Sequence, residues 1–394
     1  MEVVNLALRN GADLELEDGG KIGAIAGNGA GNGDGNSVVF HGNGTTEVMG
    51  GISQIEELIV NNNTIVHGDV ETNNLKINDA MQVGTESESF DVTIQDGYIT
   101  ELGSLTATNL DIVYDGNNGH SFDVMGQVDL SGKLTVGTNG DFSLVGGTAL
   151  VQDLALAGTT SAVLVGYEPD EGAKDDPETI YDDTKNYTGF LEVTDTTELN
   201  GGILAVDPNY SQHAAMVSLN KLSHGAASLP DLQAGSLDGH LYVGQNAALG
   251  IGSDSLATLQ AKVAKFQNAN GAFNPNEIGS IVYLGDSFDV ANNAGLILTA
   301  KTIAQFMADY NQGNAPTAAD FGVGTYVPTL SNTVYLGANT ALLIDADVMA
   351  KADTKQSSTE AVISFSSADK GTVIADGGDI IIDGDVRAST YQVF

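Results

Sequence analysis

The sequence predicts an all-β fold, a right-handed parallel β-helix with short α-helical and loop insertions. Two observations lead to it: short strands that alternate apolar and polar residues, and a corner phrase that recurs along the chain. In the phrase, an apolar residue and a Gly precede a few small or polar residues and then another alternating strand. Copies begin at Val83, Val136, Val243, Leu284 and Leu336. Gly permits the backbone conformations of a corner, and alternation places one side chain inside and the next in water.

The strands predicted by this alternation are short. Runs such as Leu75-Lys-Ile77 and Leu134-Thr-Val136 span three to five residues, and no Pro occurs before Pro169. A β-sandwich would show longer strands joined by tight hairpins. Brief strands separated by frequent turns fit a solenoid, in which successive coils stack along one axis.

The pattern divides the chain into three stretches. Residues 1–166 are predicted to form regular coils. Residues 167–188 are predicted to form an acidic loop insertion, because they carry many carboxylates and two Pro residues. Residues 189–394 are predicted to form coils with helical insertions near 254–268 and 299–310, where the apolar period changes from 2 to 3.6 residues. The apolar stripes of these two insertions are Leu256, Leu259, Val263 and Phe266, then Ile303, Phe306, Met307 and Tyr310.

Composition excludes several classes of function. The chain has 14 Lys and Arg against 52 Asp and Glu, a formal net charge of −38, so nucleic acid and anionic lipid are poor partners. It has no Cys, which rules out disulfides and thiolate sites. No apolar run approaches the roughly 18 residues that span a bilayer, so we expect no membrane insertion by this fragment.

Carboxylates in two Asp-x-Asp strings are the candidates for catalysis. Asp345 and Asp347, and likewise Asp383 and Asp385, lie two residues apart and would share a strand face. Such pairs can act as acid and base on polysaccharides, or they can face outward and keep the protein soluble. Trp is absent and only two Arg are present, which disfavours glycosidases and lyases. Ser287 follows Gly285-Asp286 and so resembles the nucleophile of an esterase motif, but it begins a Ser-Phe-Asp-Val string that also occurs at Ser89 and Ser121, and this repeat explains it. The sequence therefore predicts no catalytic residue.

Metal binding has two candidate segments. The Gly-rich stretch around Asp34 loosely resembles a Gly- and Asp-rich Ca²⁺ repeat, but in a single copy. The acidic loop offers hard oxygen ligands for Ca²⁺, although it can equally be a solvated loop. The six His are dispersed, which disfavours Zn²⁺, and no other cofactor is expected.

The acidic loop is also the candidate partner-binding element. Its Tyr residues can anchor a partner on a rigid scaffold, or they can clamp the loop to the coils. The residues concerned are Tyr167, Asp175, Asp176, Tyr181, Asp182, Asp183 and Tyr187.

The second half of the chain carries strings that resemble a known family. They include Leu199-Asn-Gly-Gly-Ile-Leu-Ala-Val206, Tyr242-Val-Gly-Gln-Asn-Ala-Ala-Leu249 and Val334-Tyr-Leu-Gly-Ala-Asn-Thr-Ala-Leu342. Together they resemble the β-helical passenger region of large bacterial autotransporters, or type V secreted adhesins. The resemblance covers residues 195–394 and implies a fold and a location, but no functional residue.

What the resemblance implies is a non-enzymatic rod on the extracellular side of a Gram-negative cell. Such a rod would be adhesin-like and would bind a host or bacterial surface ligand, protein or glycan. It could also contribute to biofilm, or self-associate end to end through the open sheet edges of a β-helix. The alternative is a polysaccharide-processing β-helix, like a phage tailspike or a pectin-degrading enzyme.

Overall fold

The computed structural model describes a little over half of the chain. The described residues are 4–9, 11–17, 19–27, 35–85, 87–94, 99–101, 103–113, 120–138, 140–157, 161–166, 189–200, 202–206, 214–224, 240–253, 255–274, 276–285, 295–298, 333–336, 339–345, 372–375 and 379–383. The chain divides into two compact units. Unit 1 comprises residues 1–155 and 169–185, and unit 2 comprises residues 156–168 and 186–394.

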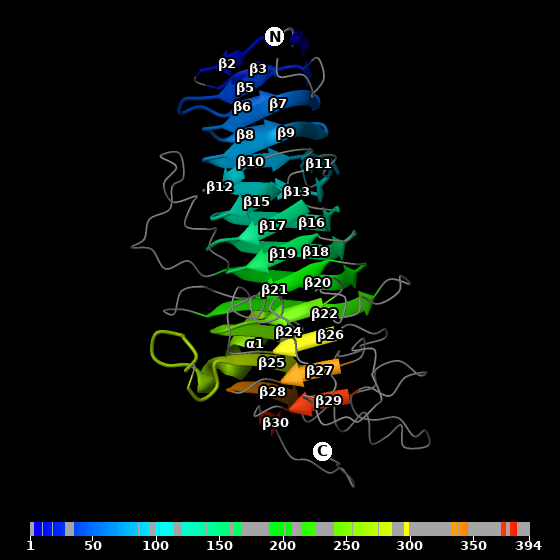
Figure 1. Ribbon diagram of the computed structural model, residues 1–394. Coiled ribbons are helices and arrows are strands. Elements are labelled where there is room, and N and C mark those ends of the chain that lie inside the picture. The colour runs from blue at the N-terminus through cyan, green and yellow to red at the C-terminus, as the bar shows by residue number, and fades with distance from the viewer. Residues whose placement is uncertain are drawn as a thin grey trace. The chain divides into compact units, whose positions relative to one another are not determined.

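Unit 1 is a stack of short parallel strands (Figure 1). Its strands are β1 (Leu6–Ala7), β2 (Leu14–Leu16), β3 (Gly20–Ile22), β4 (Ile25–Ala26), β5 (Ser37–Phe40), β6 (Thr46–Val48), β7 (Ile52–Val60), β8 (Thr64–Val66), β9 (Val70–Ile77), β10 (Ala80–Val83), β11 (Asp91–Ile94), β12 (Ile99–Glu101), β13 (Ser104–Ala107), β14 (Asn109–Ile112), β15 (His120–Val124), β16 (Gln127–Val136) and β17 (Gly140–Leu144). The next strand, β18 (Thr148–Leu156), ends at the boundary of the unit.

These strands form parallel ladders in which each strand pairs with the equivalent strand one coil later. One ladder runs β3, β6, β8, β10, β13 and β16. A second runs β1, β4, β7, β9, β11, β14 and β16. A third ladder contains β2, β5 and the C-terminal halves of β7 and β9. Later in the chain, β12 pairs with β15 and β15 pairs with β17. The predicted parallel β-helix is therefore confirmed.

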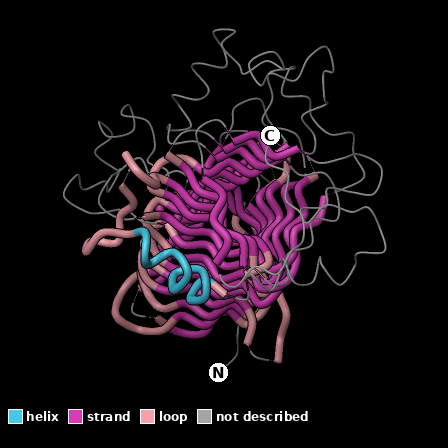
Figure 2. Tube along the Cα trace, turned by 90° about the horizontal axis from the view of Figure 1, so that it is seen from below, coloured by secondary structure: helices cyan, strands magenta, loops and turns pink. Residues whose placement is uncertain are grey.

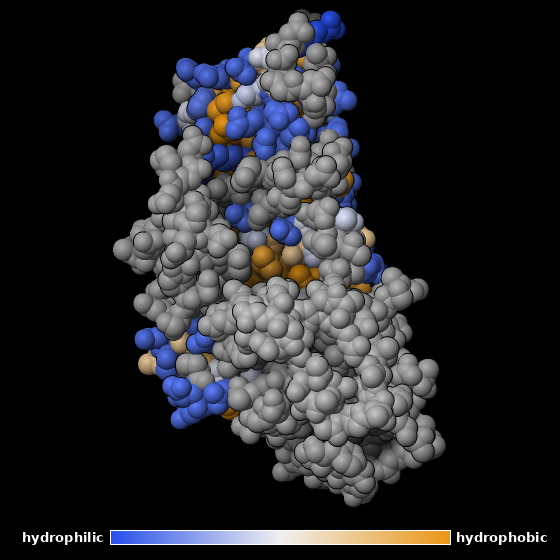
Figure 3. Space-filling model, in the orientation of Figure 1, coloured by the Kyte–Doolittle hydropathy of each residue, from blue (hydrophilic) through white to orange (hydrophobic). Residues whose placement is uncertain are grey.

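Alternation explains why unit 1 buries one side of each strand. In β14, Leu110 and Ile112 are buried while Asn109 and Asp111 are partly exposed. Leu110 stacks in register between Val92 and Leu134 of the neighbouring coils, so aliphatic side chains form continuous interior rows. The described side chains coloured in Figure 3 are mostly hydrophilic over the first coils, as this alternation requires.

Some strands are longer than the sequence predicts. β7 and β9 have 9 and 8 residues because each runs through a corner and pairs on two faces. A register shift between Ile52 and Ile55 makes the bend, and Gln54 there adopts a φ of 55°. A bulge thus replaces the expected break between strands.

Unit 2 contains two further parallel ladders. The first runs β19 (Ala162–Val165), β21 (Ile203–Val206), β23 (His240–Val243), β26 (Gly295–Leu298), β27 (Thr333–Leu336) and β29 (Thr372–Ala375). The second runs β20 (Phe190–Leu199), β22 (Ala215–His224), β24 (Ala247–Ile251), β25 (Ser280–Leu284), β28 (Thr340–Asp345) and β30 (Asp379–Asp383).

Helix α1 (Leu256–Val263) confirms the helical insertion predicted near 254–268. It is capped by Ser255, whose Oγ accepts from the Thr258 N–H at 3.2 Å. Figure 2 shows α1 lying outside the stacked strands. The helical insertion predicted at 299–310 lies outside the described residues.

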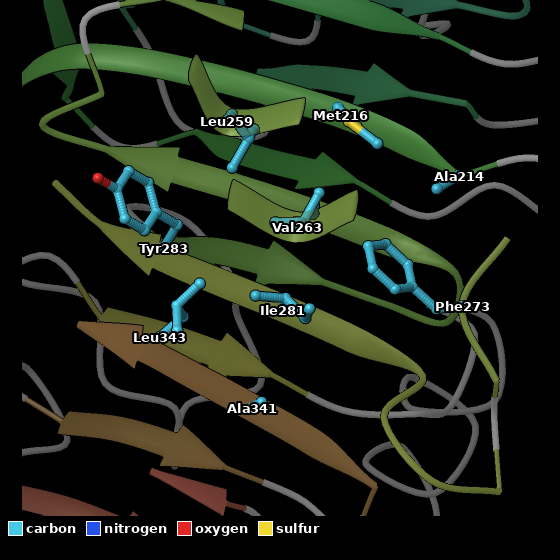
Figure 4. Close-up of a cluster of buried hydrophobic side chains, with 10 residues drawn as sticks. Ala214, Met216, Leu259, Val263, Phe273, Ile281, Tyr283, Ala341 and Leu343 are labelled. Carbon is cyan, nitrogen blue, oxygen red and sulfur yellow. The ribbon is translucent and has the colours of Figure 1, made fainter. Parts of the chain in front are cut away.

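The helix explains why two strands of unit 2 do not alternate. Every residue of β24 and β25 is buried, because their inner sides face the solenoid interior and their outer sides face α1. Figure 4 shows Leu259 and Val263 of α1 against the outward side chains of this sheet. The cluster comprises Ala214, Met216, Ala248, Leu259, Val263, Phe273, Ile281, Tyr283, Ala341 and Leu343. Strands buried on both faces have continuous apolar sequences.

Candidate functional site

The predicted partner-binding loop lies outside the described residues. This applies to Tyr167, Asp175, Asp176, Tyr181, Asp182, Asp183 and Tyr187, and also to Asp34, Ser287, Asp347 and Asp385. Their roles stay predictions.

Two of the predicted carboxylate positions are brought together in a way that the sequence did not indicate. Asp345 on β28 and Asp383 on β30 are direct register partners on adjacent parallel strands. The sequence paired each Asp with the second Asp of its own string, whereas the backbone places the first members of the two strings side by side. Adjacent strands are about 4.8 Å apart, so Asp345 and Asp383 lie closer together along the backbone than two Asp residues that are two positions apart on one strand.

The carboxylate pair with the most unusual environment lies in unit 1, on β15 and β17. Phe122 and Phe142 are register partners that stack inside the solenoid, with ring centroids 5.8 Å apart. Because side chains alternate, Asp123 and Asp141 lie on the outer side of the same two strands. Asp123 pairs in register with Ser143, and Asp141 pairs with Ser121. The two Asp residues are therefore diagonal neighbours, with Cα atoms about 8 Å apart from strand spacing and rise.

Burial gives Asp141 a distinct protonation behaviour. Desolvation, the larger cause, and the negative charge of Asp123 together raise the pKa of Asp141 from 3.8 to about 7. Both effects disfavour the ionised form. A carboxyl group that keeps its proton near neutral pH can donate that proton, and the neighbouring Asp123 can act as the partner carboxylate.

The sequence contains a partial signal for this pair of carboxylates. Ser121-Phe-Asp123-Val is one copy of the recurring string, and the next coil carries Asp141-Phe-Ser143-Leu, with Asp and Ser exchanged about the Phe. If both strands carried the same string, each Asp would pair with an Asp. Because Asp and Ser are exchanged, each Asp pairs with a Ser, and the two carboxylates are diagonal neighbours. Recognising it requires the register between β15 and β17, which the string alone does not supply.

Other outward Asp and Asn side chains of unit 1 connect successive coils. Each accepts a hydrogen bond from a group in the following coil. The bonds are Ala24 N to Asn5 Oδ1 (2.9 Å), Ser37 N to Asp13 Oδ1 (3.3 Å), Asp91 N to Asp69 Oδ1 (3.1 Å), Asn109 Nδ2 to Asp91 Oδ1 (2.8 Å) and Lys133 N to Asn109 Oδ1 (2.7 Å). Part of the chain's acidity therefore has a structural use.

The described residues offer neither a metal-binding cluster nor a membrane-spanning helix. Among them, no group of three or more His, Asp or Glu side chains is arranged to hold a metal ion. Helix α1 and the rest of the described chain include no helix with the length and apolar character needed to cross a bilayer.

Comparison with known proteins gave no match. No protein family model fits the chain, and no curated protein or solved structure is similar to it.

Proposed function

We propose that the chain is a non-enzymatic, extracellular scaffold of a Gram-negative cell surface, an adhesin-like passenger that presents loops to a surface ligand. The observation that carries this proposal is the set of coil-to-coil hydrogen bonds on the outer side of unit 1. These bonds join several neighbouring coils through outward side chains, in addition to the strand ladders. A stack joined both inside and outside is suited to holding inserted loops at fixed spacing.

The acidic loop is the element we propose to contact the ligand, which would be a protein or a glycan. Deleting residues 168–186 should preserve the circular dichroism spectrum and weaken attachment to cells or matrix. A matched variant that changes Asp175, Asp176, Asp182 and Asp183 to Asn keeps the loop length and tests the charges alone. Attachment unchanged in both variants would remove the loop from the proposal.

Two further expectations accompany this proposal. Ca²⁺ binding by the acidic loop would appear in calorimetry of the parent and be lost in the variant with the four Asn substitutions. End-to-end association would appear in sedimentation velocity as species that grow with protein concentration, and added salt would strengthen it by screening the net charge of −38.

A second candidate function is polysaccharide processing, and Asp141 is the observation that favours it. Its raised pKa and its diagonal partner Asp123 have the form of an acid and a base on one surface. The test is a glycan panel assayed with the parent, with Asp141→Asn and with Asp111→Asn, an outward Asp of β14, as a matched control. Turnover that only Asp141→Asn abolishes would replace the scaffold proposal, and no turnover by the parent would end this second candidate.

A further inference from the structure

One corner of unit 1 is longer than the corners stacked against it. Between β5 and β6, the register pairs Phe40 with Val60 and Thr46 with Thr64. Residues 41–45 therefore form a corner of five residues, against three (61–63) in the next coil. The coil after that has three (78–80), and the coil before has three (17–19). Two extra residues enlarge this corner alone among the four.

The enlarged corner carries Asn43-Gly44-Thr45, the Asn-x-Thr acceptor sequence for N-linked glycans. Asn43 and Thr45 are both exposed. Gly42 has a φ of 90°, a conformation that favours Gly. The main chain stays attached on either side, because His41 N–H donates to the Leu16 carbonyl at 2.8 Å and the Thr45 carbonyl accepts from Gly20 N–H at 3.0 Å.

The next coil supplies an internal comparison. Asn62-Asn63-Thr64 is a second Asn-x-Thr sequence, and it lies in the three-residue corner stacked on the first. Asn62 is 1% exposed, and its Nδ2 donates to the His41 carbonyl at 2.8 Å and to Thr46 Oγ1 at 3.0 Å. The Thr64 hydroxyl donates to Asn62 Oδ1 at 2.9 Å. A sugar could reach this amide nitrogen only if the coil opened.

We propose that Asn43 is an acceptor site for an N-linked glycan, which would project from the enlarged corner. A bond forms between Asn43 Nδ2 and the anomeric carbon of the donor sugar. The bond from that carbon to a diphosphate breaks, the diphosphate leaves with the electron pair, and the amide nitrogen gives up one proton to a base of the transferase. No oxidation or reduction occurs. The donor is a lipid-linked diphosphate oligosaccharide or a nucleoside diphosphate sugar.

The test uses the folded full-length chain in two reactions. One contains an oligosaccharyltransferase with a lipid-linked oligosaccharide, and the other contains a soluble N-glycosyltransferase with UDP-glucose, so the two donor classes are distinguished. Peptide mass spectrometry then assigns the modified residue. This assignment is needed because Asn186-Tyr-Thr188 and Asn209-Tyr-Ser211 are further acceptor sequences, outside the described residues.

The expected result is modification of the Asn43 peptide in at least one reaction and an unmodified Asn62 peptide in both. Asn43→Gln and Thr45→Ala should each abolish the modification while the circular dichroism spectrum stays unchanged. No modification of Asn43 in either reaction, its persistence in Thr45→Ala, or modification of Asn62 in folded protein would overturn the proposal. This proposal depends on the proposed surface location only for where in the cell the modification would take place. Because the enzymes are supplied in the assay, its failure leaves cell attachment to be judged separately.

Discussion

Asp141 is expected to make unit 1 less stable as the pH rises. Burial and Asp123 raise the pKa of its carboxyl group from 3.8 to about 7. A shift of about 3 pKa units, at 1.36 kcal/mol per unit, corresponds to about 4 kcal/mol. Because the folded pKa is the higher one, folding takes up a proton between pH 4 and pH 7. The favourable contribution of the protonated Asp141 to the free energy of unfolding is complete below pH 4, decreases as the pH rises, and is lost above pH 7.

The substitution Asp141→Asn tests this because it keeps the shape of the side chain and removes the charge. At pH 8 the variant should exceed the parent in free energy of unfolding by up to about 4 kcal/mol, whereas near pH 4 the two should be close. Denaturant unfolding of both proteins at intervals from pH 4 to pH 8.5, followed by circular dichroism, measures the difference.

A second variant separates the two causes of the shift. Asp123→Asn removes the repulsion but leaves the burial of Asp141, which is the larger cause. It should therefore recover only the smaller part of the pH-dependent loss. Parallel stability curves for the parent and Asp141→Asn over this whole pH range would refute the reasoning, because they would mean that Asp141 ionises equally in the folded and unfolded chain.

Two further predictions concern polar contacts of unit 1. The pKa of Glu88 is lowered by hydrogen bonds from His67 (3.0 Å) and Thr85 (3.1 Å), so the contact stabilises above the ordinary Glu pKa and is lost as the pH falls through the lowered value. Glu88→Gln should therefore lower the thermal midpoint more at pH 7 than near pH 3; an equal decrease at both values would contradict this. Asn62→Ala would leave buried partners without their hydrogen bonds and should lower the free energy of unfolding by about 1–3 kcal/mol in denaturant titration. The exposed control Asn43→Ala should change it by less than about 0.5 kcal/mol, and equal effects would show that the Asn62 contacts do not stabilise the stack.

The sequence predicted those parts of the fold in which local pattern decides the structure. Leu110 and Ile112 alternate with Asn109 and Asp111, and this alternation alone indicates which side is buried. Helix α1 was predicted from its own apolar stripe, because a 3.6-residue period does not depend on the rest of the chain.

The carboxylate neighbours could not be predicted, because they depend on register between coils. Asp141 follows Asp123 by 18 residues, while Asp383 follows Asp345 by 38. Each coil can divert a different length of chain into loops, so residue spacing along the sequence does not state which positions meet. A shift of one residue would also move each side chain to the opposite face. The pairing appears only when the strands are aligned, as β15 is with β17 and β28 is with β30.

The outer apolar face of unit 2 depends on one small residue where α1 approaches the sheet. A Cβ added at Gly250 of β24 would lie 3.3 Å from Leu259 Cδ1 and 3.0 Å from Ser253 Cβ. Gly250→Val should therefore push α1 outward, at the roughly 1–3 kcal/mol typical of overpacking. Hydrogen exchange of residues 256–263 should become faster.

Combining Gly250→Val with Leu259→Ala tests whether the two side chains compete for the same space. Alone, Leu259→Ala should also speed exchange in α1, because it removes a fully buried side chain. In the double variant, the valine would occupy the space that Leu259 vacates, so exchange should be slower than in either single variant. Additive effects would show that the two residues do not compete for the same space. The close approach of α1 would then not be what permits β24 and β25 to be apolar on both sides.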